Sequence, residues 1–190
     1  MPNRLVSRAV LAACFALPAA LAGCMGAGMQ DPGAAASARG MGNEHVFETV
    51  MAANRSEIAL SQQAEQRAAS AEVRAFAARM VAEHTRAETD MAALGQQLGL
   101  SPRESDTSRN LDEFTRLTTV SMESRSGAEF DREYMRLQVQ QHGWLVEALD
   151  KNLIPAAQDE RLRAELQRMR PMAAAHLRDA QRLHRSLGGS

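Results

Sequence analysis

Three histidines occupy positions that helical periodicity directs toward the interior of the molecule. His84 and His176 each stand at one position of an otherwise apolar heptad pattern, and His142 lies beside a third apolar stripe. A heptad seam normally excludes imidazole, because burying a polar group costs free energy unless the group is bonded. Imidazole together with a carboxylate suits Zn, Cu, Fe or Ni, and bundle cores commonly hold such sites. The histidines are therefore candidate ligands of a single transition-metal ion.

Glu57 is the carboxylate best placed to join the histidines. It lies at nearly the same depth below a short interhelical joint as His84, with an offset of about 1.5 Å along the helix axes. His142 and His176 also fall near the middle of their helices. We therefore predict that Glu57, His84, His142 and His176 converge inside the molecule, each supplied by a different helix.

The alternative is a structural role, in which each imidazole is a buried, hydrogen-bonded core group that makes the packing specific. Asn54, Ser61, Tyr134 and Gln138 are the polar residues that could satisfy the imidazoles. From residue types alone this structural role is the commoner one for a histidine on an apolar face.

Several known kinds of site are disfavoured by the sequence. A ferritin di-iron centre needs a glutamate three residues before the histidine on two helices, and Val81 and Ala173 stand there instead. Glu83 directly precedes His84 and points about 100° away from it, which excludes a zincin pair. The sequence also lacks the nucleophile elbow, the C-x-x-C motif and a strand-linked glycine-rich loop. An enzyme is therefore the less favoured class.

Other residues near the histidines could support them. Glu88 and Asp179 could orient imidazoles as hydrogen-bond acceptors, although both could equally be surface charges. Met80, Met169 and Met172 lie close to histidines along the chain, a combination that can bind copper. Methionine at heptad positions is more commonly a core filler.

Four segments carry apolar residues at alternating spacings of three and four, the period of an amphipathic helix. They cover residues 43–69, 71–98, 126–154 and 159–187. Capping and breaking residues predict their ends: Asn43, Ser70, a Ser126–Glu129 capping box and Asp159 for the starts, and Gly99 with Ser101–Glu104, Pro155 and Gly188 for the ends. Pro171 should kink or restart the last helix.

The connection between the second and third of these helices, residues 99–126, is long for a bundle. It contains an amphipathic piece with Leu111, Phe114 and Leu117 on one side, which predicts a short extra helix folded over the bundle. Short joints elsewhere and one long connection are typical of a ferritin-like four-helix bundle. The predicted fold is thus all-α and ferritin-like, and a plain up-down-up-down bundle is the alternative.

The amino terminus has the order of an export signal. Arg4 and Arg8 precede an apolar run, residues 9–22, that is too short to span a bilayer. The run ends in Leu21-Ala22-Gly23-Cys24, which resembles the lipobox of bacterial lipoproteins. We predict a lipoprotein signal peptide over residues 1–23 and lipidation of Cys24. An ordinary secretory signal is the alternative.

The predicted mature chain has three parts: lipidated Cys24, a flexible tether over residues 24–42 and the helical domain over residues 43–187. Gly, Ala, Met and Ser dominate the tether, which lacks an apolar period. Met25 after the cysteine resembles the pattern that sorts lipoproteins to the outer membrane. The expected location is a membrane surface facing the periplasm.

Charge excludes one class of partner. The formal net charge is −1, and the sequence lacks the clustered basic face that nucleic-acid binding needs. The expected partners are the membrane, through the lipid, and a protein, a cell-envelope component or a second copy of the chain.

Four segments resemble the domain-of-unknown-function 4142 family: residues 76–85, 130–134, 138–142 and 171–177. The resemblance covers roughly residues 43–187. It implies an exported, ferritin-like helical bundle often described as an outer-membrane protein, and it implies no activity. Two functions remain open from the sequence: a non-enzymatic envelope binding or structural module, which we favour, and a metal-binding bundle with one Zn, Cu or Fe ion.

Overall fold

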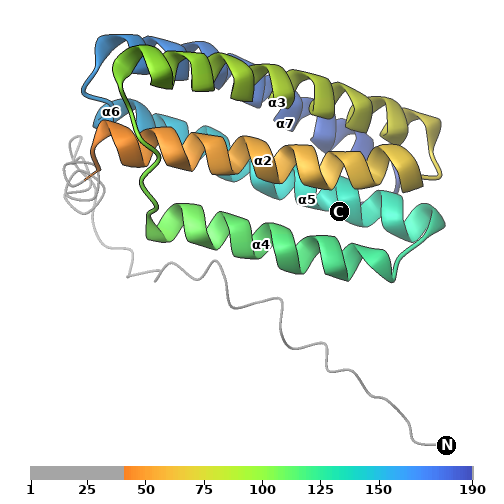
Figure 1. Ribbon diagram of the computed structural model, residues 1–190. Coiled ribbons are helices and arrows are strands. Elements are labelled where there is room, and N and C mark those ends of the chain that lie inside the picture. Colours follow the sequence, from red (N-terminus) through yellow and green to blue (C-terminus); the bar gives the residue numbers. More distant parts are fainter. Residues whose placement is uncertain (1–40, 190) are drawn as a thin grey trace, which may run out of the picture.

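The structure is a computed structural model that describes residues 41–189 (Figure 1). Within this range the chain forms helices and no strands, which confirms the all-α prediction. The helices are α2 (Asn43–Arg67), α3 (Ala71–Leu98), α4 (Asp106–Glu123), α5 (Gly127–Ala148), the π-helix η1 (Leu149–Leu153), α6 (Ile154–Ala156) and α7 (Glu160–Ser186). The predicted signal peptide, Cys24 and nearly all of the tether lie outside the described residues.

Helix α2 lies at the centre of the arrangement. It packs most closely against α3, and α4 covers its other side, while α5 and α7 lie behind (Figure 1). Its buried residues consequently point in every direction around the helix and include polar ones such as Thr49, Ser56 and Glu57. The polar middle of this segment is thus explained by neighbours on all sides rather than by one face toward a core.

Two turns confirm their predicted chemistry. The Ser70 hydroxyl accepts a hydrogen bond from the Val73 amide and begins α3, and Gly99 ends α3 with a φ of 64°. The buried Asp131 carboxylate of α5 adds two hydrogen bonds that the sequence did not reveal, because it accepts from the amides of Ala69 and Ser70 at 2.9 and 2.7 Å. The α2–α3 joint is therefore fixed from outside as well as by its own cap.

The helix in the connection after α3 differs from the prediction in its length and in its capping. The extra helix α4 has 18 residues, which is longer than the short helix predicted, and it begins at a capping box formed by Ser105 and Ser108 that was not predicted. The predicted capping box at Ser126 is also wrong: its side chain makes no cap bond. Gly127 takes a φ of 57°, and the Phe130 amide donates a helical backbone hydrogen bond to the Ser126 carbonyl.

Predictions for the other helix ends need three corrections. Gly42, not Asn43, caps α2, and the Asn43 side chain accepts from the amides of Gln158 and Asp159 at the start of α7. The third helix does not stop before Pro155, because η1 leads into α6, which contains Pro155 and ends at Ala156. Pro171 lies inside an α7 that runs without a break.

Buried apolar side chains form two clusters, one toward each end of the bundle. One contains Val46, Met91, Leu149 and Leu166, and the other contains Val73, Met80, Phe130 and Leu137. A layer of buried polar side chains separates the clusters. This polar layer consists of Asn54, Glu57, Ser61, His84, Gln138, Gln141, His142 and His176.

Among residues 41–189, no helix combines the length and the apolar composition that crossing a bilayer requires.

Candidate metal centre

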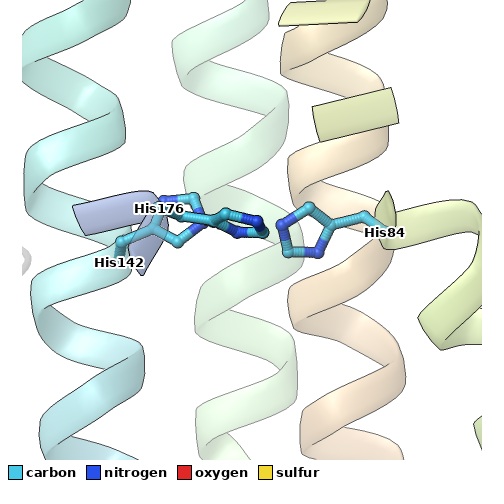
Figure 2. Close-up of side chains that lie close together, drawn as sticks. All are labelled: His84, His142 and His176. Atoms are coloured by element: carbon cyan, nitrogen blue, oxygen red, sulfur yellow. The ribbon is translucent and has the colours of Figure 1, made fainter. Parts of the chain in front are cut away.

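His84, His142 and His176 meet in the middle of the polar layer, where α3, α5 and α7 each contribute one ring (Figure 2). The ring centroids are 5.6 Å apart for His84 and His142, 5.5 Å for His84 and His176, and 5.1 Å for His142 and His176. All three residues are at most 3% exposed. We call this group the trihistidine cluster.

One nitrogen of each ring is bonded to a protein acceptor on the outside of the cluster. His84 Nδ1 lies 2.9 Å from Asn54 Oδ1, and His142 Nδ1 lies 3.1 Å from the Gln138 carbonyl. His176 Nε2 lies 2.5 Å from Glu83 Oε2. A neutral imidazole has one N–H and one lone pair, so donation at these outer nitrogens directs the lone pairs of the inner nitrogens into the cluster.

Two of the inner nitrogens are spaced as ligands of one ion would be. His142 Nε2 and His176 Nδ1 are 3.2 Å apart. Two ligands of a tetrahedral ion at about 2.0–2.1 Å lie about 3.3 Å from each other. One nitrogen from each of the three rings lies within 4.8 Å of the others. His84 Nε2 is buried and bonds to no other atom of residues 41–189. Three neutral nitrogen donors thus lie close enough together to be candidate ligands of one ion.

Protonation of the cluster is opposed by its surroundings. Burial lowers the pKa of His142 to about 4. Burial also lowers the pKa of His84 well below its ordinary value, and the neighbouring histidines lower it further. For His176, burial and His142 lower the pKa against the opposing influence of Glu83. At neutral pH the cluster therefore presents lone pairs, the form that binds a metal ion.

Glu57 enters the polar layer beside the cluster, not among its inner nitrogens. One of its oxygens lies 3.6 Å from His142 Nδ1, and the other accepts from Gln138 Nε2 at 2.8 Å. Burial raises its pKa to about 7, although the Gln138 bond opposes the rise. Between pH 4 and pH 7 both Glu57 and His142 are consequently uncharged, so their contact is not an ion pair. The structure brings all four predicted residues together, but it places the Glu57 carboxylate beside the outer nitrogen of His142 and not beside the inner nitrogens.

Glu83 is the residue of the site that sequence reasoning missed. It was considered only as a partner of the adjacent His84, whereas its carboxylate bonds to His176 across the α3–α7 seam. The 100° rotation from His84 is the signal that could have found it, because that rotation points Glu83 from α3 toward a neighbouring helix.

The other residues considered from sequence have different roles. Asp179 forms ion pairs with Arg79 and Arg182, and no bond joins Glu88 to the cluster within the described chain. Ser61 and Tyr134 bond to each other at 2.9 Å rather than to an imidazole. The methionines at 80, 169 and 172 pack in or against the apolar clusters.

Comparison with known proteins gives the family and nothing further. Searches of curated proteins and of solved structures found no match. The family model described as a domain of unknown function (DUF4142) matches residues 28–183, which is most of the chain. This match supports the resemblance noted from the four short segments, and the chain belongs to the DUF4142 family.

Proposed function

We propose that this chain is an exported lipoprotein whose helical domain binds one transition-metal ion through His84, His142 and His176. The observation that carries the proposal is the arrangement of the three rings: each outer nitrogen is bonded to the protein, and the rings offer three nitrogens within 4.8 Å of one another. Histidine ligands of metals almost always have this second bond, which fixes the tautomer and the ring orientation.

The lone pairs of the cluster favour a cation at its centre. Two neutral acceptor nitrogens 3.2 Å apart repel each other unless a proton or a metal ion lies between them. The lowered pKa values disfavour the proton. Imidazole nitrogens suit Zn²⁺, Cu²⁺ and Ni²⁺, and three of them leave a fourth position for water or another ligand.

Charge balance supports a divalent ion. Glu57 lies against His142 and Glu83 against His176, so two carboxylates flank the three neutral ligands. A cation would favour ionisation of Glu57, whose pKa burial alone raises to about 7. A divalent ion with two ionised carboxylates leaves the buried layer close to neutral.

Metal analysis tests this proposal directly. Protein purified without a polyhistidine tag or chelator, then titrated with Zn²⁺, should bind one ion per chain. His84→Ala or His176→Ala should weaken binding by more than the roughly 10–100-fold typical of losing a supporting hydrogen bond. His184→Ala removes a histidine near the end of α7 and should leave affinity unchanged. If wild-type protein binds no Zn²⁺, Cu²⁺ or Ni²⁺, the cluster is a polar core network, and the envelope binding or structural role stands.

The anchor is proposed from the order of the amino-terminal residues. Cys24 follows a basic segment, an apolar run and small residues, as in lipoprotein precursors. The proposed location is the outer membrane, with the domain facing the periplasm, and Cys24→Ser should release the domain from the membrane fraction of the cell. A variant that stays with the membrane and keeps the wild-type mass would contradict the anchor; Cys14→Ser, within the predicted signal peptide, is the matched control.

A ferritin-like topology is proposed as the architecture of this site. It is supported by two closely packed helix pairs, α2–α3 and α5–α7, joined by a long connection that contains α4. An experimental structure with helix directions differing from that pattern would contradict it.

A further inference from the structure

The trihistidine cluster is enclosed on most sides. Asn54, Glu57 and Gln138 border it toward α2 and α5, and each is at most 3% exposed. Beyond them, α4 covers α2, and Thr115 of α4 donates a hydrogen bond to Ser56 at 2.7 Å. An ion cannot reach the cluster from this side without separating packed helices.

The seam between α3 and α7 is different, because here one side chain joins the cluster to solvent. The Glu83 side chain is 39% exposed, and its carboxylate bonds to His176 Nε2. Among the side chains bonded to the three rings, Glu83 therefore provides the contact with water. Carboxylate oxygen is also a ligand for the same divalent ions that imidazole binds.

A surface groove lies on this seam, and its lining residue Arg79 is one helical turn from Glu83. Its volume is about 440 Å³, and Phe76 and Arg79 of α3 and Asp179 and Leu183 of α7 are among the residues that line it. The Arg79–Asp179 ion pair, 2.7 Å long, crosses the seam one helical turn from Glu83. The pair therefore lies on the seam beside the exposed Glu83 carboxylate. Its guanidinium also repels cations.

We infer that metal ions reach and leave the trihistidine cluster through the α3–α7 seam, with Glu83 as the first ligand and the Arg79–Asp179 ion pair as the barrier. The inference rests on the proposed function and adds a route to it. An ion binds the exposed Glu83 carboxylate, passes the ion pair and moves to the inner nitrogens. Glu83 then accepts the His176 Nε2 hydrogen bond again.

The barrier is tested by exchange rates in the full folded domain. Co²⁺ serves as the probe because its visible absorption reports binding to nitrogen ligands; association is followed after mixing, and dissociation after addition of excess chelator. Arg79→Gln should raise both rates by roughly two- to fivefold, the factor expected from losing a partly exposed ion pair, with little change in affinity. Arg168→Gln is the matched control, because Arg168 pairs with Asp90 across the same seam on the other side of the cluster. Equal effects of the two variants would overturn the inference.

The ligand role of Glu83 is tested by Glu83→Gln, which keeps an oxygen that can accept from His176 Nε2 but removes the charge. Association of Co²⁺ should slow by about tenfold, as for loss of local electrostatic attraction. Glu88→Gln removes a charge from the same helix without a bond to the cluster and should leave the rate near wild type. Unchanged association in Glu83→Gln, with only faster dissociation, would overturn the route and leave Glu83 as a positioning residue. Failure of wild-type protein to take up Co²⁺ at equilibrium would instead contradict the proposed function itself.

Discussion

The two apolar clusters and the polar layer between them use the same helices in opposite ways. In the apolar clusters, side chains such as Leu166 and Leu137 gain stability simply by leaving water, and hydrophobic residues of similar volume could replace them. In the polar layer each buried group needs a particular partner, and His84 Nε2 has none within the described chain. The apolar clusters are therefore stabilised by burial alone, whereas the polar layer is stabilised only where its buried groups have partners.

The largest expected effect lies in the apolar clusters. Leu166→Ala in one cluster and Leu137→Ala in the other should each lower the free energy of unfolding by about 2–5 kcal/mol, because both leucines are almost fully buried. Chemical denaturation followed by circular dichroism measures this, with and without Zn²⁺. Leu117 of α4 is 43% exposed, so Leu117→Ala is the control and should cost about 0.5 kcal/mol or less. Equal losses in all three variants would remove the distinction between cluster and surface.

The next effect belongs to Glu57 and depends on pH. The raised pKa, about 7 against an ordinary 4.5, means that the folded chain keeps a proton that the unfolded chain releases between these values. The free energy of unfolding therefore falls as pH rises through this window, by on the order of 3 kcal/mol from this group alone. Glu57→Gln should remove that fall in metal-free protein.

Denaturation between about pH 5 and about pH 8 with a chelator present measures this contribution. The histidines act in the opposite sense, since their lowered pKa values reduce stability as pH falls below 6.5. That influence remains in the variant. Exposed Glu113→Gln is the control, because its pKa lies below the ordinary value and outside the window. An unchanged slope in Glu57→Gln would mean that Glu57 is ionised in the fold.

The smallest effect should come from His84→Leu in metal-free protein. The variant gains apolar burial but leaves the Asn54 side chain without its partner, so the two contributions nearly cancel, to within about 1 kcal/mol. With Zn²⁺ present, only the wild type should gain stability. A loss in the metal-free variant as large as that of Leu166→Ala would show that the polar layer itself holds the fold together.

The convergence of the histidines could be predicted because it follows from helical period and depth alone. His84 and His176 interrupt apolar heptads, and a residue at such a position points inward whatever its type. The sequence predicted correctly that Glu57 lies in the polar layer. It did not predict on which side of His142 the Glu57 carboxylate lies, because this depends on the rotation of α2 among three neighbouring helices.

Features that depend on contacts between distant segments could not be read from the sequence. Glu83 bonds to a residue 93 positions away, and Asp131 caps a joint more than 60 positions earlier. The Ser126–Glu129 pattern did not form its capping box, and Gly127, which follows Ser126, takes a left-handed conformation that glycine permits. The spacing of apolar residues did not indicate the π-helix before Pro155.

The division of the cluster between the two helix pairs has a consequence for folding. The α2–α3 pair supplies His84 with Asn54 and Glu57, whereas the α5–α7 pair supplies His142 and His176. Each pair can form from contacts that are close in sequence, which are the contacts that form fastest. The three rings meet only when the pairs dock, so the cluster is a late element of the folding reaction. An ion bound to all three rings would connect the two pairs like a reversible cross-link, and its release would have to precede their separation, which slows unfolding.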